Sequence, residues 1–162
     1  MVNNVFLSMI QYFGTDTKRI NHALKVYGFA TTLLVSENIT GKLKECIDYA
    51  AILHDIGIHE AERKYQSTSG KYQEIEGPAI ATKILKDCGI TDEIIDRVCF
   101  LIGNHHSYQK IDGMDFQILV EADFLVNIHE DEMKKSSIES IRNNYFKTIT
   151  GKRIIDSLYL VV

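Results

Sequence analysis

The sequence predicts an all-α fold, a single-domain bundle of about six to eight helices, and three observations support this prediction. Apolar residues recur at the three- and four-residue spacing of an amphipathic helix along most of the chain. The 162 residues include a single proline, Pro78, and its scarcity favours long helices because proline interrupts them. Strand patterns are weak and are confined to Leu158–Val162.

Length and composition predict one domain. A chain of 162 residues corresponds to one domain of ordinary size, here 1–162. Its composition, 45% hydrophobic and 25% charged, is typical of globular proteins and does not shift along the chain. We expect the core of the bundle at about 18–128 and a C-terminal helical segment and tail at 131–162.

Glycines and capping residues predict the boundaries of the first helices. A short first helix ends at Gly14, and Thr15 or Asp16 caps a second helix that runs to about residue 37. A third helix is expected over about 43–56, before the next glycine. The apolar stripe of the second helix is expected to comprise Leu24, Tyr27, Ala30 and Leu34.

Turn-forming residues divide the second half of the chain. Residues 66–71 are rich in Ser, Thr and Gly and indicate a loop. Pro78 is expected near the start of the following helix, where a missing N–H costs little. Later helices are expected over about 91–102, 115–129 and 132–146, followed by an apolar segment at 154–162.

Charge and cysteine content exclude several classes of protein. The net charge is −4 and no basic cluster occurs, so no nucleic-acid partner is expected. No apolar run approaches the roughly 18 residues that span a bilayer, and Met1–Ser8 does not resemble a signal peptide, so we expect a cytoplasmic protein without a membrane partner. Cys46, Cys88 and Cys99 lack metal-finger spacing and are expected to be free thiols.

Several ionisable residues share a helical stripe with apolar residues and are expected to point inward. They are His22, His54, Asp55, His105 and Asp123. A lone buried histidine is usually a hydrogen-bonded core residue. Two buried carboxylates, Asp55 and Asp123, cost several kcal/mol unless a cation accompanies them. Because no obvious buried Lys or Arg accompanies them, a divalent metal ion is the expected counter-charge.

The types of the candidate ligands restrict the metal. Imidazole and carboxylate together suit Fe, Mn, Co, Ni or Zn rather than Ca. No cysteine is among the candidates, which favours an open catalytic site over a closed structural zinc site.

This ordered set of residues on separate helices resembles the HD-domain superfamily of metal-dependent phosphohydrolases. The resemblance covers about 18–128 and implies that one ion is bound by His22, His54, Asp55 and Asp123. The supporting motifs are Leu53-His54-Asp55-Ile56-Gly57, Glu76-Gly77-Pro78-Ala79-Ile80-Ala81, Leu101-Ile102-Gly103-Asn104-His105-His106 and Glu121-Ala122-Asp123.

Two positions depart from the pattern of that superfamily. Members with two metals add a histidine pair, present here as His105-His106, and a further histidine where this chain has Gln73. Glu74 and Glu76 lie beside Gln73, so a carboxylate is one replacement, and whether a second ion binds stays open. Many relatives carry Lys or an acidic residue where this chain has Ile58.

The resemblance implies hydrolysis of a small phosphate ester or anhydride, nucleotide-like, by a metal-activated water. The expected catalytic residues are Asp55, His105, His106 and Glu76. Asp55 is expected to be a ligand and local proton acceptor, and either histidine a second-metal ligand or general acid. Lys71 is expected to hold the anionic substrate and Tyr108 to stack on its ring.

Two other functions stay open. The domain is alternatively a non-catalytic nucleotide-binding module, which the departures at Ile58 and Gln73 would permit. It is alternatively a diiron oxygenase, which a histidine-rich site permits. The expected partner in the leading interpretation is a small phosphorylated molecule, and self-association through the apolar C-terminal tail also stays open.

Overall fold

The computed structural model describes residues 1–160, and over these residues the predicted all-α fold is confirmed. A 3-10 turn at Tyr108–Lys110 precedes α7, and a π-helical turn at Asp156–Leu160 follows α9. The nine α-helices of this described part are α1 (Val2–Phe13), α2 (Thr17–Ser36), α3 (Gly41–Leu53), α4 (Ile58–Tyr65), α5 (Gly70–Asp87), α6 (Asp92–Ile102), α7 (Met114–Glu130), α8 (Lys135–Tyr145) and α9 (Ile149–Ile155).

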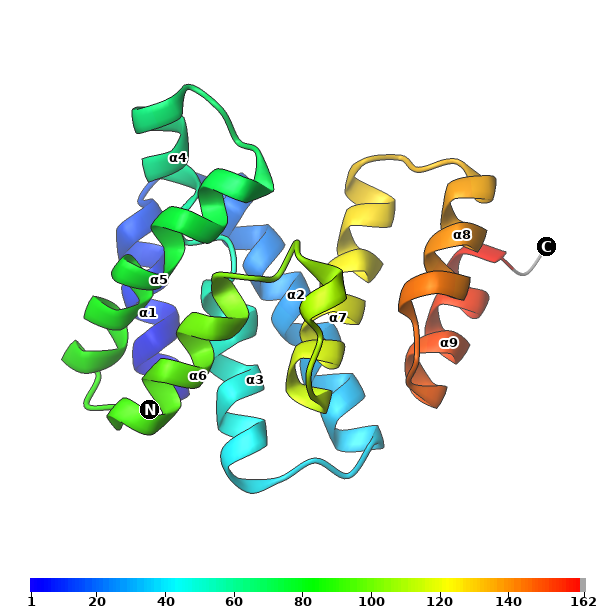
Figure 1. The fold of residues 1–162 in the computed structure, drawn as a ribbon, viewed down its shortest axis with the longest axis horizontal. Helices are drawn as coiled ribbons and strands as arrows, with labels where there is room; N and C mark the ends of the chain where they lie inside the picture. The colour runs from blue at the N-terminus through cyan, green and yellow to red at the C-terminus, as the bar shows by residue number, and fades with distance from the viewer. Residues whose placement is uncertain (161–162) are drawn as a thin grey trace.

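Helices α2, α3 and α7 form the centre of the bundle, and each packs against the other two (Figure 1). Residues Cys46–Leu53 of α3 and Asp115–Val126 of α7 are buried without interruption, as expected for helices covered on all sides. Helices α1 and α6 cover α3, and α5 packs on the outer side of α6, while α8 and α9 lie at the opposite end of the molecule (Figure 1).

The predicted boundaries of α2 are confirmed, and its predicted apolar stripe is correct at Ala30 and Leu34 but wrong at Leu24. Asp16 caps α2 by accepting a hydrogen bond from the Arg19 N–H at 3.2 Å. Leu24, however, has 43% of its surface exposed. Besides Ala30 and Leu34, the buried face of α2 comprises His22, Ala23, Val26 and Leu33.

The third helix ends earlier than predicted, and a short helix follows it. Residues 54–57 form tight turns after Leu53, and α4 begins at Ile58. A Cβ atom at Gly57 would lie 2.6 Å from the Gln73 carbonyl oxygen and from the Gly77 nitrogen. The absence of a side chain at Gly57 thus lets this turn pack directly on α5. The sequence did not predict α4, because only Ile58 and Ala61 of its eight residues are buried.

Pro78 lies inside α5, so its predicted position near a helix start is wrong. The helix begins at Gly70, where a Cβ atom would overlap the His106 ring, and the preceding loop is therefore shorter than predicted. The Thr82 hydroxyl donates a hydrogen bond to the Pro78 carbonyl at 2.8 Å. Immediately before the proline, Gly77 packs closely against Gly57.

The C-terminal segment is helical where the structure describes it. The weak strand prediction for Leu158–Val162 is wrong at 158–160, which belong to the π-helical turn, and residues 161–162 lie outside the described residues. Among the helices of residues 1–160, none combines the length and hydrophobicity needed to cross a bilayer.

Candidate metal centre

Two groups of ligand-type side chains converge where α2, α3 and α7 meet. Nitrogen and carboxylate oxygen atoms of His22, His54 and Asp123 lie within 4.8 Å of one another. A second group, equally close together, comprises Asp55, His105 and His106. The structure therefore brings together all six of the metal-ligand candidates predicted from the sequence.

The hydrogen bonds of His22 and His54 fix which ring nitrogen is available. His54 donates from Nδ1 to the Ala51 carbonyl at 3.0 Å, and His22 donates from Nδ1 to Glu130 Oε2 at 2.9 Å. In their neutral forms both rings therefore carry a lone pair on Nε2. These two Nε2 atoms lie 3.1 Å apart. Two lone pairs at this separation repel each other unless a cation lies between them.

Asp123 adds negative charge at the same point. Its Oδ1 atom lies 3.3 Å from His22 Nε2 and 3.6 Å from His54 Nε2. Asn127, one turn later on α7, donates a hydrogen bond to this oxygen at 2.9 Å and orients the carboxylate. Glu130 accepts the hydrogen bond of the other ring nitrogen of His22, as carboxylates commonly do for metal-binding histidines. The donor set fits a divalent transition-metal ion.

The carboxylates around these two histidines favour their protonated forms in the metal-free protein. Burial opposes protonation of His22, but Asp123, Asp55 and Glu130 raise its pKa to about 9. His54 behaves in the same way, because Asp55 and Asp123 raise its pKa despite complete burial. The two imidazolium groups in turn lower the pKa of Asp123, against the effect of burial. Metal binding near neutral pH must therefore release protons from these histidines.

The stability of the metal-free protein is expected to fall as pH rises from 6.5 to 9. His22 has a pKa of 6.5 when unfolded and about 9 when folded. Its stabilising contribution is complete below 6.5 and is lost as pH rises through 9, a change on the order of 3 kcal/mol. Urea unfolding with a chelator present measures this. In a His22→Gln variant the free energy of unfolding should depend less on pH. If it changed equally with pH in both proteins, the raised pKa would not belong to His22.

Asp55 faces both ligand groups with different oxygens. Its Oδ2 atom lies 3.6 Å from the Nε2 atoms of both His22 and His54, while its Oδ1 atom lies 3.3 Å from His105 Nε2. Burial would raise the pKa of Asp55, but His54 and His105 lower it well below the usual value. An ionised carboxylate in this position can bridge two cations.

His105 and His106 present free imidazole nitrogens. His105 donates from Nδ1 to the Ile102 carbonyl at 2.7 Å, which leaves the lone pair on Nε2. Burial, reinforced by His105, lowers the pKa of His106 to about 4, so its ring is neutral at pH 7. Among residues 1–160 neither Nε2 atom has a hydrogen-bond partner, although His105 Nε2 lies 3.3 Å from Asp55 Oδ1. Glu74 supports this segment by accepting hydrogen bonds from the His106 N–H at 2.9 Å and the Ser107 hydroxyl at 3.2 Å.

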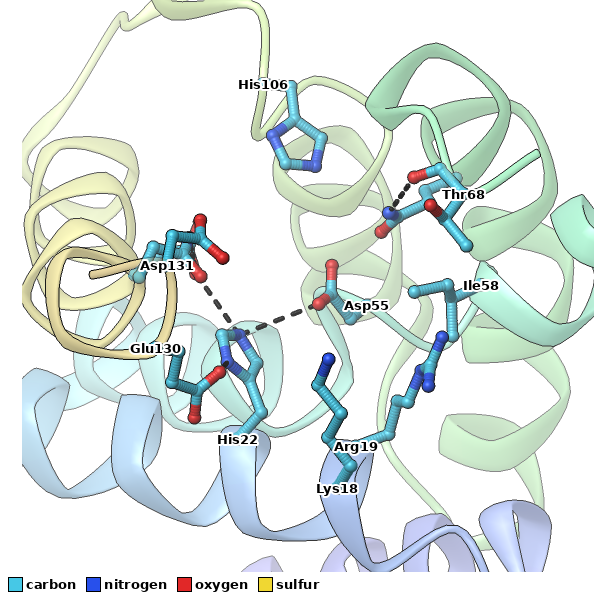
Figure 2. A pocket seen from close by; sticks show the side chains of 12 residues that line it. Lys18, Arg19, His22, Asp55, Ile58, Thr68, His106, Glu130 and Asp131 are labelled. Atoms are coloured by element: carbon cyan, nitrogen blue, oxygen red, sulfur yellow. Dashed lines mark hydrogen bonds and ion pairs between the residues drawn. The ribbon is translucent and has the colours of Figure 1, made fainter. Parts of the chain in front are cut away.

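A cavity of about 330 Å³ opens over the two groups. His22, Asp55 and His106 line it, and the Lys18 side chain extends into it (Figure 2). Arg19 also lines the cavity, although Glu62 accepts a hydrogen bond from its guanidinium at 2.9 Å. Lys18 forms no ion pair with any other residue of 1–160. The cavity therefore combines an acidic, histidine-rich side with a basic side.

Lys18 was not predicted from the sequence, although a signal for it exists. It precedes His22 by four residues, so the two side chains lie on one face of α2. Ile58 forms an apolar part of the cavity wall (Figure 2). Lys18 and Arg19 are the basic residues lining this cavity in the described chain.

Five predicted site residues do not line the cavity: the ligand candidates His54 and His105, which are buried behind it, and three residues expected at the substrate, Glu76, Lys71 and Tyr108. Glu76 accepts hydrogen bonds from Lys64 at 2.5 Å and the Tyr65 hydroxyl at 2.9 Å. The Lys71 ammonium lies 6.0 Å from the centre of the Tyr72 ring. Tyr108 packs with its ring centre 5.1 Å from that of Phe124 and 4.7 Å from that of Tyr145. The structure thus separates all three from the two ligand groups.

The fold and this centre define an all-α protein with a His/Asp site built to hold a divalent cation. The chain belongs to the HD domain family, whose model matches residues 19–142. A crystal structure of a predicted HD superfamily hydrolase from an uncultured Thermotogales bacterium is similar, with a TM-score of 0.70 at 20% sequence identity. The match covers 97% of this chain and 84% of that chain. At this identity the likeness concerns the fold. A search of curated proteins found no match.

Proposed function

We propose that this protein is a metal-dependent phosphohydrolase acting on a small phosphate ester or anhydride, nucleotide-like in character. The observation that carries the proposal is the cavity, which has Lys18 and Arg19 in its lining together with members of both groups of metal-ligand side chains. An anionic phosphate fits between a bound cation and these basic side chains. The family and its similar solved structure, which is named as a predicted hydrolase, support the same class of reaction.

The residues of the site have separate tasks in this proposal. When bound, a divalent ion lowers the pKa of coordinated water toward about 7 and neutralises charge on a phosphoryl oxygen. Asp55 acts as a ligand, because its lowered pKa makes it a weak proton acceptor. His106, with a pKa of about 4, is a ligand or proton acceptor at neutral pH and not a general acid. Lys18 binds the phosphoryl oxygens.

The test is a phosphate-release screen. Metal-free protein is supplied with Mn, Co, Ni, Fe or Mg and offered nucleoside mono- and triphosphates, cyclic nucleotides and simple phosphomonoesters, with chelator as the control. Turnover with at least one metal and none with chelator supports the proposal. Nucleotide binding without phosphate release under any metal would instead indicate a binding module. A metal-dependent reaction requiring O₂ would indicate an oxygenase.

Replacing Lys18 with alanine is expected to raise KM at least about tenfold with a smaller effect on metal binding. The ammonium is the cavity's unpaired cation, and a charge-assisted hydrogen bond to phosphate contributes about 1.5–3 kcal/mol. Steady-state kinetics with the substrate from the screen measures the change. Lys71→Ala is the matched control, because Lys71 lies outside the cavity and its loss should leave KM within about twofold. Equal effects of the two variants would contradict the role of Lys18.

A further inference from the structure

We propose that Gln73 is a metal ligand, and that its side-chain oxygen completes a second ion position with Asp55, His105 and His106. The proposal rests on the metal dependence of the proposed function but not on its substrate. In this proposal one ligand of the second ion is a neutral amide oxygen, whose chemistry differs from that of an imidazole nitrogen.

Unpartnered polar atoms gather at this place. In residues 1–160, five buried side-chain nitrogen or oxygen atoms lack a hydrogen-bond partner. Three of the five are His105 Nε2, His106 Nε2 and Gln73 Oε1. An unpaired buried polar atom costs about 1–3 kcal/mol, so three in one place indicate a ligand that pairs with all of them.

The orientation of the Gln73 amide is determined by its surroundings. The Gln73 side chain is 6% exposed, and its Nε2 donates a hydrogen bond to the Thr68 carbonyl at 2.8 Å. A carbonyl can only accept, so the amide nitrogen must face Thr68 and the oxygen must face away from it. Exchanging the two atoms would place two acceptors against each other. Gln73 therefore offers an acceptor, the atom type that a cation requires.

The start of α5 places Gln73 between the other members of the group. Gly70, one turn earlier, packs against the His106 ring, and Glu74 accepts from the His106 N–H. The Gln73 carbonyl lies against Gly57, two residues after Asp55. Gln73, Asp55 and His106 line the same cavity. The backbone of α5 around Gln73 therefore packs against both the Asp55 turn and the His106 loop, and the Gln73 side chain lines the cavity with Asp55 and His106.

The chemistry of the two ion positions then differs. The first has two imidazoles and the Asp123 carboxylate, with Asp55 shared between positions. The second has two imidazoles and an amide oxygen, which is neutral and harder than nitrogen. We therefore expect the second position to bind more weakly and to accept oxygen-preferring ions such as Mn²⁺.

Titration of the metal-free full chain with Mn²⁺, followed by the electron paramagnetic resonance signal of free Mn²⁺, tests the proposal without reference to activity. The wild type should bind two ions with distinct affinities. Gln73→Met keeps the length of the side chain but removes the oxygen, and Mn²⁺ does not favour a thioether ligand. This variant should weaken Mn²⁺ binding at the second, weaker site at least about tenfold and leave the affinity of the first site within about twofold of the wild type. Gln73→Glu supplies a charged oxygen and should tighten the second class.

The remaining outcomes overturn the proposal. An unchanged second class in both variants would make Gln73 only a hydrogen-bond partner of Thr68. A wild type that binds one ion would remove the second position and leave the proposed function standing. A wild type that binds no Mn²⁺, Co²⁺ or Fe²⁺ would overturn the metal dependence itself, and with it the proposed function. If Gln73→Met fails to fold, Gln73→Glu alone still decides the question.

Discussion

Replacing His54 with alanine is expected to lower kcat/KM at least about 10³-fold and to abolish stabilisation by metal. His54 is fully buried at the end of α3, and its Nε2 atom faces His22, Asp55 and Asp123. Without this imidazole the first ion position loses a ligand that no nearby side chain replaces. Loss of a bound ion removes several kcal/mol of transition-state stabilisation, and about 4 kcal/mol corresponds to 10³ in rate.

Two measurements check this expectation. The first is the phosphate-release assay, and the second is the thermal shift on adding metal, which for the wild type reflects up to about 4 kcal/mol at a thousandfold excess over Kd. His129→Ala is the matched control, because His129 is exposed near the end of α7. It should retain both the activity and the shift. A metal-induced shift of wild-type size in His54→Ala would show that the ion binds elsewhere.

The arrangement of α2, α3 and α7 could be predicted from the sequence because it depends on patterns that are local in the chain. Glycine after α1, Asp16 before α2 and the continuous apolar run of α3 each act within one or two turns. The position of Pro78 could not be predicted in this way. Its helix depends on contacts of Gly57 with Gly77, and these residues are distant in the sequence.

The ligand groups were predictable for a related reason, and the substrate side was not. A buried carboxylate without a counter-charge is costly wherever it lies, so the apolar stripes around Asp55 and Asp123 are enough to indicate a cation. Lys71, in contrast, is predicted to bind the substrate only because it is charged and lies in a loop. Whether a lysine reaches a cavity depends on tertiary geometry, and the structure places Lys18 there instead. Glu130 was likewise missed, because its contact with His22 joins residues 108 positions apart.

Glu121, two residues before Asp123, is buried but serves the fold and not the metal centre. Its side chain is 0% exposed and accepts hydrogen bonds from Gln117 Nε2 at 2.8 Å and from the Lys147 N–H at 2.6 Å. The N–H and hydroxyl groups of Thr148 also donate to it, at 2.9 and 2.5 Å. Because Thr148 caps α9, this carboxylate fixes the α8–α9 junction on α7.

Replacing Glu121 with alanine is expected to lower the free energy of unfolding by about 3–5 kcal/mol, a large part of the total for a domain of this size. The variant leaves the Thr148 N–H buried without an acceptor, at about 1–3 kcal/mol, and removes the acceptor of the partly buried Lys147 N–H at a smaller cost. Gly151→Ala should give a loss of the same kind, because a Cβ atom there would overlap the Glu121 carboxylate. Urea unfolding measures both, with Glu139→Ala on the exposed face of α8 as the control.

Measuring metal affinity distinguishes the loss of folding stability in Glu121→Ala from damage to the metal centre. The ligand groups lie on α2, at the end of α3, after α6 and on α7, none of which needs the α8–α9 junction for its hydrogen bonds to the ligands. At a low temperature where the Glu121→Ala variant still folds, its metal affinity should therefore be within about threefold of that of the wild type. The variant should nevertheless unfold at a lower urea concentration. A stability loss below about 1 kcal/mol would show that water replaces the carboxylate at the junction. An equal loss of stability and of metal affinity would instead place Glu121 among the residues that position Asp123.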